Sequence, residues 1–91
     1  MRLKKIWASV LAGGKNVRFA DMVKLIEAFG FHLSRINGSH HIFAYPGVPE
    51  LVNLQEVGGK AKPYQIGQFL RLVEKYNLRM KEDAGTEEHT A

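Results

Sequence analysis

The dipeptide Asn37-Gly38 constrains the fold of this 91-residue chain more than any other feature. It lies between two runs, residues 31–36 and 39–45, in which apolar and polar residues tend to alternate. This combination is the strongest short-range signal of a β-hairpin. Because strand side chains point alternately to the two faces of a sheet, one face of each strand is expected to cover a core. The sequence therefore predicts an antiparallel sheet built around this hairpin.

A third strand and a loop are predicted after the hairpin. Pro46-Gly47 ends the second strand, and the run Leu51-Val52-Asn53-Leu54 supplies a short third one. Residues 55–62 are polar, basic and glycine-bearing, which predicts a loop.

Three further segments have the apolar spacing of amphipathic helices. Residues 1–12 form the first, which Gly13-Gly14 stops, and the second ends where Gly30 would be a left-handed C-cap. The third begins at Pro63, where a missing N–H costs nothing, and is expected to end near Leu78. The apolar stripes are Leu3, Ile6, Trp7, Val10 and Leu11; Phe19, Met22, Val23, Ile26 and Phe29; and Ile66, Phe69, Leu70, Val73 and Tyr76.

The order helix, helix, three strands, helix predicts an α+β fold in which helices bury one face of a small three-stranded antiparallel sheet. An α-β-β-β-α core is the arrangement of double-stranded-RNA-binding domains, and residues 1–12 would be an extra amino-terminal helix. The length predicts a single domain over residues 1–81, with its core at 18–79. Residues 82–91 hold four of the nine acidic side chains, which predicts a disordered acidic tail.

Charge and cysteine content narrow the class of partner. Residues 1–81 carry 13 basic and 5 acidic side chains, a net charge of +8. Such a surface favours a polyanion such as RNA, although it also serves solubility. Cysteine is absent, which excludes disulfides and thiol catalysis and suits a reducing cytoplasm. No segment approaches the roughly 18 to 20 apolar residues of a membrane span, so no membrane partner is expected.

The hairpin turn decides which side chains share a face of the sheet. If Asn37-Gly38 is a two-residue turn, Arg35 pairs with His40, and both lie at the rim of the face that the helices cover. That face would also carry Phe31, Leu33, Ile42 and Ala44. The opposite face would show His32, His41, Phe43 and Tyr45. A one-residue bulge would exchange these assignments.

The adjacent histidines are candidates for acid–base chemistry. Imidazole exchanges protons near neutral pH, as cleavage of RNA through its 2′-hydroxyl requires, and the Arg35 guanidinium could hold the scissile phosphate. The alternative is that His40 and His41 are ordinary polar residues of a strand surface. They point to opposite faces with no third ligand at a recognisable spacing, so neither a metal nor another cofactor is expected.

Other side chains are candidates for RNA binding. Phe43 and Tyr45 could stack on bases from an open sheet face, or cover an oligomer interface. Lys60 and Lys62 precede the last helix, whose N-terminal end favours phosphate, although both lysines could equally belong to a solvated loop.

These residues also resemble a known family. Gly30-Phe31, Ser34-Arg35, the element Gly38-Ser39-His40-His41-Ile42-Phe43 and Pro46-Gly47 are similar to the signature of HicA-type toxins, over about residues 21–78. The resemblance implies a double-stranded-RNA-binding-like fold, metal-independent mRNA interferase activity and neutralisation by a HicB antitoxin that covers the active histidine. The essential glycine and histidine of the family correspond to Gly38 and His40, with His41 as the alternative. Many members have a proline-x-histidine element after the third strand, and the matching residues 54–57 contain neither.

Three hypotheses follow. The first is an endoribonuclease toxin in which His40 exchanges the proton of the 2′-hydroxyl and Arg35 steadies the phosphate. The second is a non-catalytic RNA-binding module. The third is a protein-interaction domain in which Phe43 and Tyr45 meet a partner chain.

Overall fold

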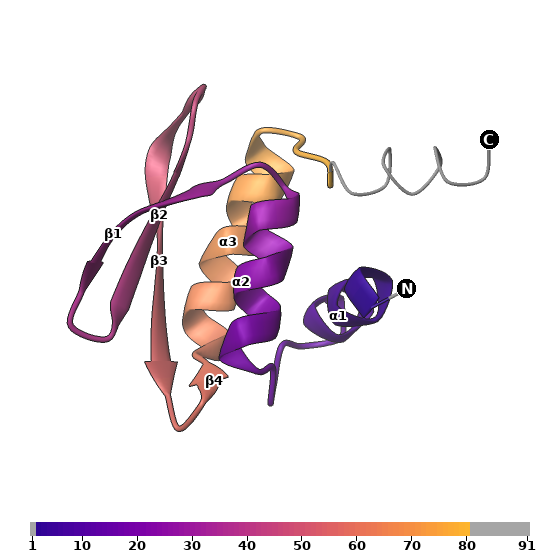
Figure 1. Cartoon of the computed structure of the whole chain (residues 1–91). Coiled ribbons are helices and arrows are strands. Elements are labelled where there is room, and N and C mark those ends of the chain that lie inside the picture. Colours follow the sequence, from indigo (N-terminus) through magenta and orange to yellow (C-terminus); the bar gives the residue numbers. More distant parts are fainter. Residues whose placement is uncertain (1, 81–91) are drawn as a thin grey trace.

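A computed structural model describes residues 2–80 and confirms the predicted α+β class. The predicted acidic tail at 82–91 lies outside the described residues. A four-stranded antiparallel sheet of order β1-β2-β3-β4 has helices α2 and α3 on one face (Figure 1). The elements are α1 (Arg2–Leu11), α2 (Phe19–Ala28), β1 (His32–Asn37), β2 (His40–Tyr45), β3 (Val48–Val57), β4 (Lys60–Ala61) and α3 (Pro63–Lys75).

Helix α1 forms a third layer, on the side of α2 and α3 that faces away from the sheet (Figure 1). The Trp7 ring packs on Phe29 of the α2 C-cap, with ring centroids 5.2 Å apart. Phe29 meets Phe69 of α3 at 5.3 Å, and Phe69 meets Phe31 at 5.7 Å. Aromatic contacts therefore run from α1 through the helical layer to the start of β1. None of the helices in residues 2–80 is long and apolar enough to cross a membrane.

The predicted loop at 55–62 is wrong, because β3 continues to Val57 and the chain returns as β4. Val57 pairs with Lys60, so Gly58 and Gly59 alone make the turn. Their φ angles of 60° and 79° are those of a type I′ turn, whose twist matches that of the flanking strands. The glycine pair thus closes a hairpin and adds a fourth, two-residue strand to the predicted three.

The turn between β1 and β2 lies one residue later than predicted. Asn37 pairs with His40, so the turn residues are Gly38 and Ser39. Gly38 has a φ of +66°, and a positive φ at the first turn position alone is the pattern of a type II′ turn. As a consequence Arg35 pairs with Ile42, and the predicted pairing of Arg35 with His40 is wrong.

A β-bulge at Ser34 decides which face is buried. Leu33 pairs with Phe43 and Arg35 with Ile42, which leaves Ser34 as the extra residue in β1. A bulge reverses the side-chain alternation of its strand. It thereby lets Phe31 and Phe43, each 1% exposed, enter the same core. The predicted burial of the Ile42 face is therefore wrong: Phe43 lies under the helices, and Ile42 lies on the open face.

The C-terminal end of α3 is hydrogen-bonded to the N-terminal part of β3. The helix ends at Lys75, slightly before the predicted Leu78. Glu50 accepts hydrogen bonds from Lys75 Nζ at 2.8 Å and from the Tyr76 hydroxyl at 2.6 Å. These two bonds, that of Lys75 first, lower the pKa of Glu50 to about 2.

Candidate functional site

His40 lies on the open face of the sheet. Its Nδ1 is 3.1 Å from Oδ1 of Asn53 in β3 and donates to that oxygen, since a carbonyl only accepts. Arg35 shares this face, as predicted, but stands opposite Ile42 rather than opposite His40. Within residues 2–80 the two side chains form no hydrogen bond with each other.

His41 lies on the helix-facing side of β2. Its ring meets the ring of Phe19, the first residue of α2, in an edge-on contact with centroids 4.8 Å apart. Its Nδ1 is 3.4 Å from the carbonyl oxygen of Ser39 and donates to it. In the neutral tautomer that donates this bond, Nε2 carries the lone pair. His41 is half-buried, so part of the residue is in contact with solvent.

A chain of hydrogen bonds connects the His41 turn to a lysine. Gln55 Nε2 donates to the Ser39 hydroxyl at 3.2 Å, and Lys62 Nζ donates to Gln55 Oε1 at 3.2 Å. Ser39 therefore contacts His41 through its carbonyl and Gln55 through its hydroxyl. We call His41, Ser39, Gln55 and Lys62 the His41 network.

Gln65 fixes the backbone of this network. Gln65 Oε1 accepts a 2.6 Å hydrogen bond from the backbone N–H of Gln55, just beyond the segment of β3 that β4 pairs. Gln65 is 9% exposed and comes from the first turn of α3. Phe19 was predicted as part of the apolar stripe of its helix, and neither it nor Gln55 nor Gln65 was predicted as a site residue. The one sequence signal for these residues was the polar side chain of Gln65 in the first turn of an amphipathic helix.

The β3–β4 hairpin is also tied to the start of α2. The Phe19 backbone N–H donates to Gly59 at 2.9 Å, and Arg18 forms a backbone bridge with Lys60. Lys60 Nζ donates to Asn16 Oδ1 at 3.0 Å. The ion pairs of the described chain join Arg2 to Asp21 and Lys75 to Glu50. Arg18 and Lys60 thus lie beside the His41 network, and neither they nor Lys62 of the network has an ion-pair partner in residues 2–80.

The predicted stacking aromatics occupy other positions. Phe43 is 1% exposed, so the prediction that it stacks on a base is wrong. Tyr45 is half-buried, and its ring lies 5.1 Å from that of Phe31. Tyr64, which was not among the predicted RNA-binding residues, is 70% exposed and lies in the chain between Lys62 and Gln65.

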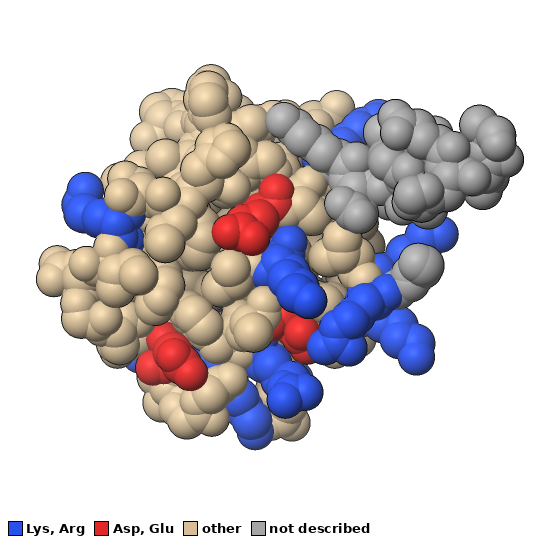
Figure 2. All heavy atoms as spheres, in the orientation of Figure 1, with Lys and Arg blue, Asp and Glu red and all other residues tan. Residues whose placement is uncertain are grey.

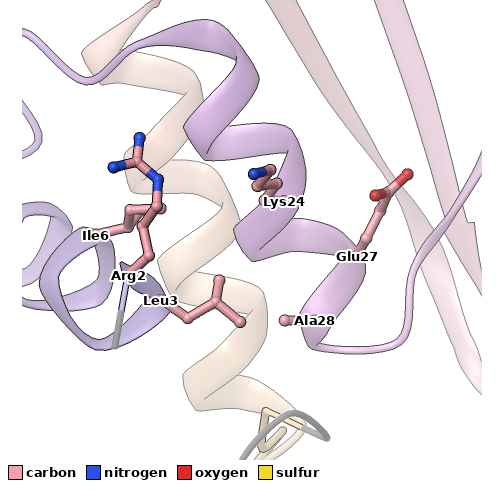
Figure 3. A pocket seen from close by; sticks show the side chains of 6 residues that line it. All are labelled: Arg2, Leu3, Ile6, Lys24, Glu27 and Ala28. Carbon is pink, nitrogen blue, oxygen red and sulfur yellow. The ribbon is translucent and has the colours of Figure 1, made fainter.

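A hollow of about 410 Å³ lies between α1 and α2, away from the histidines (Figure 3). Leu3, Ile6 and Ala28 give it apolar walls, and Glu27 points away from α1. Arg2 at its edge is paired with Asp21 at 2.7 Å. The hollow has no histidine in its lining. In the described residues no three His, Asp or Glu side chains gather as metal ligands would.

The family comparison settles what kind of domain carries these residues. The model of the HicA toxin of bacterial toxin–antitoxin systems matches residues 19–74. The chain belongs to the HicA toxin family. No curated protein and no solved structure matches significantly. The HicA match contains both histidines, Gln55, Lys62 and Gln65, and it leaves α1 outside. As a HicA-family toxin, the chain is one half of a toxin–antitoxin pair and has an antitoxin partner.

Proposed function

We propose that this HicA-family toxin is an endoribonuclease that cleaves mRNA without a metal ion, with His41 as its general base. The observation that carries the proposal is the fixed orientation of the His41 ring. The Ser39 carbonyl holds Nδ1 and Phe19 holds the ring, so Nε2 is directed by two contacts from different parts of the fold. A base held in one tautomer and one orientation loses little entropy when it meets its substrate.

The proposed reaction is attack of the RNA 2′-hydroxyl on the adjacent phosphorus. His41 Nε2 takes the hydroxyl proton, the 2′-oxygen bonds to phosphorus, and the 5′-oxygen of the next nucleotide leaves with a proton from water. The products are a 2′,3′-cyclic phosphate and a 5′-hydroxyl. Lys62, oriented by Gln55, places a positive charge where the phosphate oxygens gain negative charge. Tyr64 offers an exposed ring for a flanking base.

Two residues of the signature support this geometry indirectly. Gly38 adopts a φ of +66°, which costs other L-residues roughly 1 kcal/mol or more, and so permits the turn that aims the Ser39 carbonyl at His41. Ser39 is a positioning residue, because its hydroxyl anchors Gln55 and its carbonyl anchors His41. Neither residue needs to touch the reacting atoms.

His40 with Arg35 is the alternative catalytic pair. Two reasons favoured it: the family resemblance, which places the essential histidine at His40, and the expected pairing of His40 with Arg35. The second reason fails, because Arg35 instead pairs with Ile42. His40 is held by the Asn53 amide on a face that no helix of residues 2–80 covers. A HicB-like antitoxin that neutralises the toxin would cover the His41 network in our proposal.

The test compares the two histidines in bacteria that express the toxin from an inducible promoter. The parent, His41→Ala and His40→Ala are followed for growth and total mRNA. We expect the parent and His40→Ala to arrest growth with loss of mRNA, and His41→Ala to do neither, since a general base contributes roughly 100-fold or more. Each purified variant must show the circular dichroism spectrum of the parent. Arrest by His41→Ala together with growth of His40→Ala would assign the base to His40.

A non-catalytic RNA-binding module is a second candidate function. Gln55 stands in the stretch where many family members have a histidine, and an amide does not exchange a proton near neutral pH. A toxin that relies on two histidines would therefore be inactive here. Salt-sensitive RNA binding by the parent without any cleavage product would support this second function.

A further inference from the structure

Helix α1 brings positive charge to the same side of the molecule as the His41 network. Lys5 of α1 and Arg18, which precedes α2, line a hollow of about 180 Å³. We call this hollow the Lys5–Arg18 groove. Its remaining lining residues are Ile6, Ser9, Asn16, Val17 and Asp21.

The polar groups of the groove favour an anion. Asp21 is its acidic residue, and this carboxylate is already paired with Arg2 at 2.7 Å. Lys5 and Arg18 are exposed, and within residues 2–80 neither has an ion-pair partner. Lys60 reaches the edge of the groove through its 3.0 Å hydrogen bond to Asn16. Among the described residues, Lys5 and Arg18 therefore stand unpaired in the groove, whereas its carboxylate, Asp21, is already neutralised by Arg2.

The groove is linked to the His41 network through Arg18. Arg18 is followed in the chain by Phe19, whose ring contacts His41. The backbone of Arg18 also bridges to that of Lys60, two residues before Lys62. Figure 2 shows Lys and Arg side chains gathered at the lower right, around α1 and the lower ends of α2 and the β4 hairpin, with few on the upper part of this face. Basic side chains thus lie on the segments that connect α1 with Phe19, the ring partner of His41.

We propose that the Lys5–Arg18 groove binds backbone phosphates of the RNA strand whose scissile bond lies at His41. Helix α1, which lies outside the matched family segment, would then extend the substrate path of the domain. The inference rests on the proposed function, because the direction of the bound RNA strand follows from cleavage at His41. A strand carries one phosphate per nucleotide, which matches separate cations along a path better than a compact anion does.

The test measures binding by fluorescence anisotropy with 2′-O-methyl RNA, which has no free 2′-hydroxyl and is not cleaved. The groove variant is Lys5→Gln with Arg18→Gln. The control variant, Arg71→Gln with Arg79→Gln, removes the same charge from exposed positions outside the groove lining. Each is measured with an RNA of about 20 nucleotides and one of about four, which brackets the reach of a single small domain.

We expect the groove variant to bind the longer RNA about tenfold more weakly than the parent. The slope of log affinity against log salt should fall by about 1.4, or about 0.7 for each lost phosphate contact. The short RNA should lose much less, and the control variant should change less than about twofold. Lys5→Arg with Arg18→Lys keeps both charges and should bind the longer RNA like the parent, which tests the role of charge even if the double glutamine variant is poorly folded.

Equal affinity and equal salt slope in the parent and the groove variant would overturn the inference, as would an equal loss in the control variant. The proposed function fails independently of this test. If the groove variant binds more weakly but the parent cleaves no RNA, the groove stands and the endoribonuclease proposal does not.

Discussion

His40 and His41 are neighbours in sequence and occupy opposite faces of the sheet. His40 is held by one amide from the adjacent strand, on the face left open by the helices of the described chain. His41 is held by a ring from α2 and a carbonyl from the hairpin turn, and its turn is linked to Lys62. Two identical side chains thus differ in what surrounds them. The comparison teaches that helices and the β3–β4 hairpin, rather than the histidine motif alone, assemble a candidate site.

The largest expected effect tests the assignment of the two faces. Phe43→Ala should lower the free energy of unfolding by about 3 to 5 kcal/mol, because the ring fills the core under the helices. Ile42→Ala, on the open face with His40, should cost about 1 kcal/mol. Urea unfolding followed by circular dichroism measures both. An equal loss in the two variants would show that both faces of β2 are covered.

A smaller effect compares the cations beside the two histidines. Lys62→Ala should slow single-turnover RNA cleavage about tenfold, since it removes a charge aimed at the reacting phosphate. Arg35→Ala, on the His40 face, should slow it by less than about threefold. The assay uses protein in excess over labelled RNA. A larger effect of Arg35→Ala than of Lys62→Ala would place the catalytic site on the open face, with His40.

The smallest effect lies at the far end of β3, where Glu50 is bound by Lys75 and Tyr76. The pKa of Glu50 is lowered from 4.5 to about 2, so its contribution to stability is present above about pH 4.5 and is lost as the pH falls toward 2. Glu50→Gln should therefore flatten the stability profile over this range. Acid titration monitored by near-ultraviolet circular dichroism measures it.

The same variant is a control for the His41 network. Glu50 binds α3 near its C-terminal end, whereas Gln65 binds Gln55 from the first turn of that helix. Cleavage by Glu50→Gln at neutral pH should match that of the parent. A slower variant would mean that the position of α3 as a whole sets the geometry of the site.

The sequence predicted the elements better than their register. Apolar periodicity correctly placed the three helices, and Asn37-Gly38 correctly indicated a hairpin. The turn formed one residue later, because Gly38 at the first turn position suits a type II′ turn. Alternation alone could not show the Ser34 bulge, which allows Phe31 and Phe43 to enter one core. This single extra residue exchanged the faces of the predicted site.

The residues that complete the candidate site were beyond sequence reasoning for a different reason. Gln55 and Gln65 meet only because α3 returns across the end of β3. Phe19 meets His41 only because α2 starts beside the β3–β4 hairpin. Such long-range contacts leave no periodic signal. Of the two lysines predicted to bind RNA, Lys62 belongs to this site and Lys60 lies beside it, while their role in RNA binding remains a prediction.

The three two-residue turns of the sheet also have a kinetic consequence. Each strand pair joins consecutive strands, so loop-closure entropy is low and each hairpin can form within microseconds. The bridge between Arg18 and Lys60 instead joins residues far apart in sequence, so the two ends of a long chain segment must meet. We therefore expect this closure to limit the folding rate. The contact that brings Phe19 to His41 would be made in the same step, so the toxin would acquire its site only when folding is nearly complete.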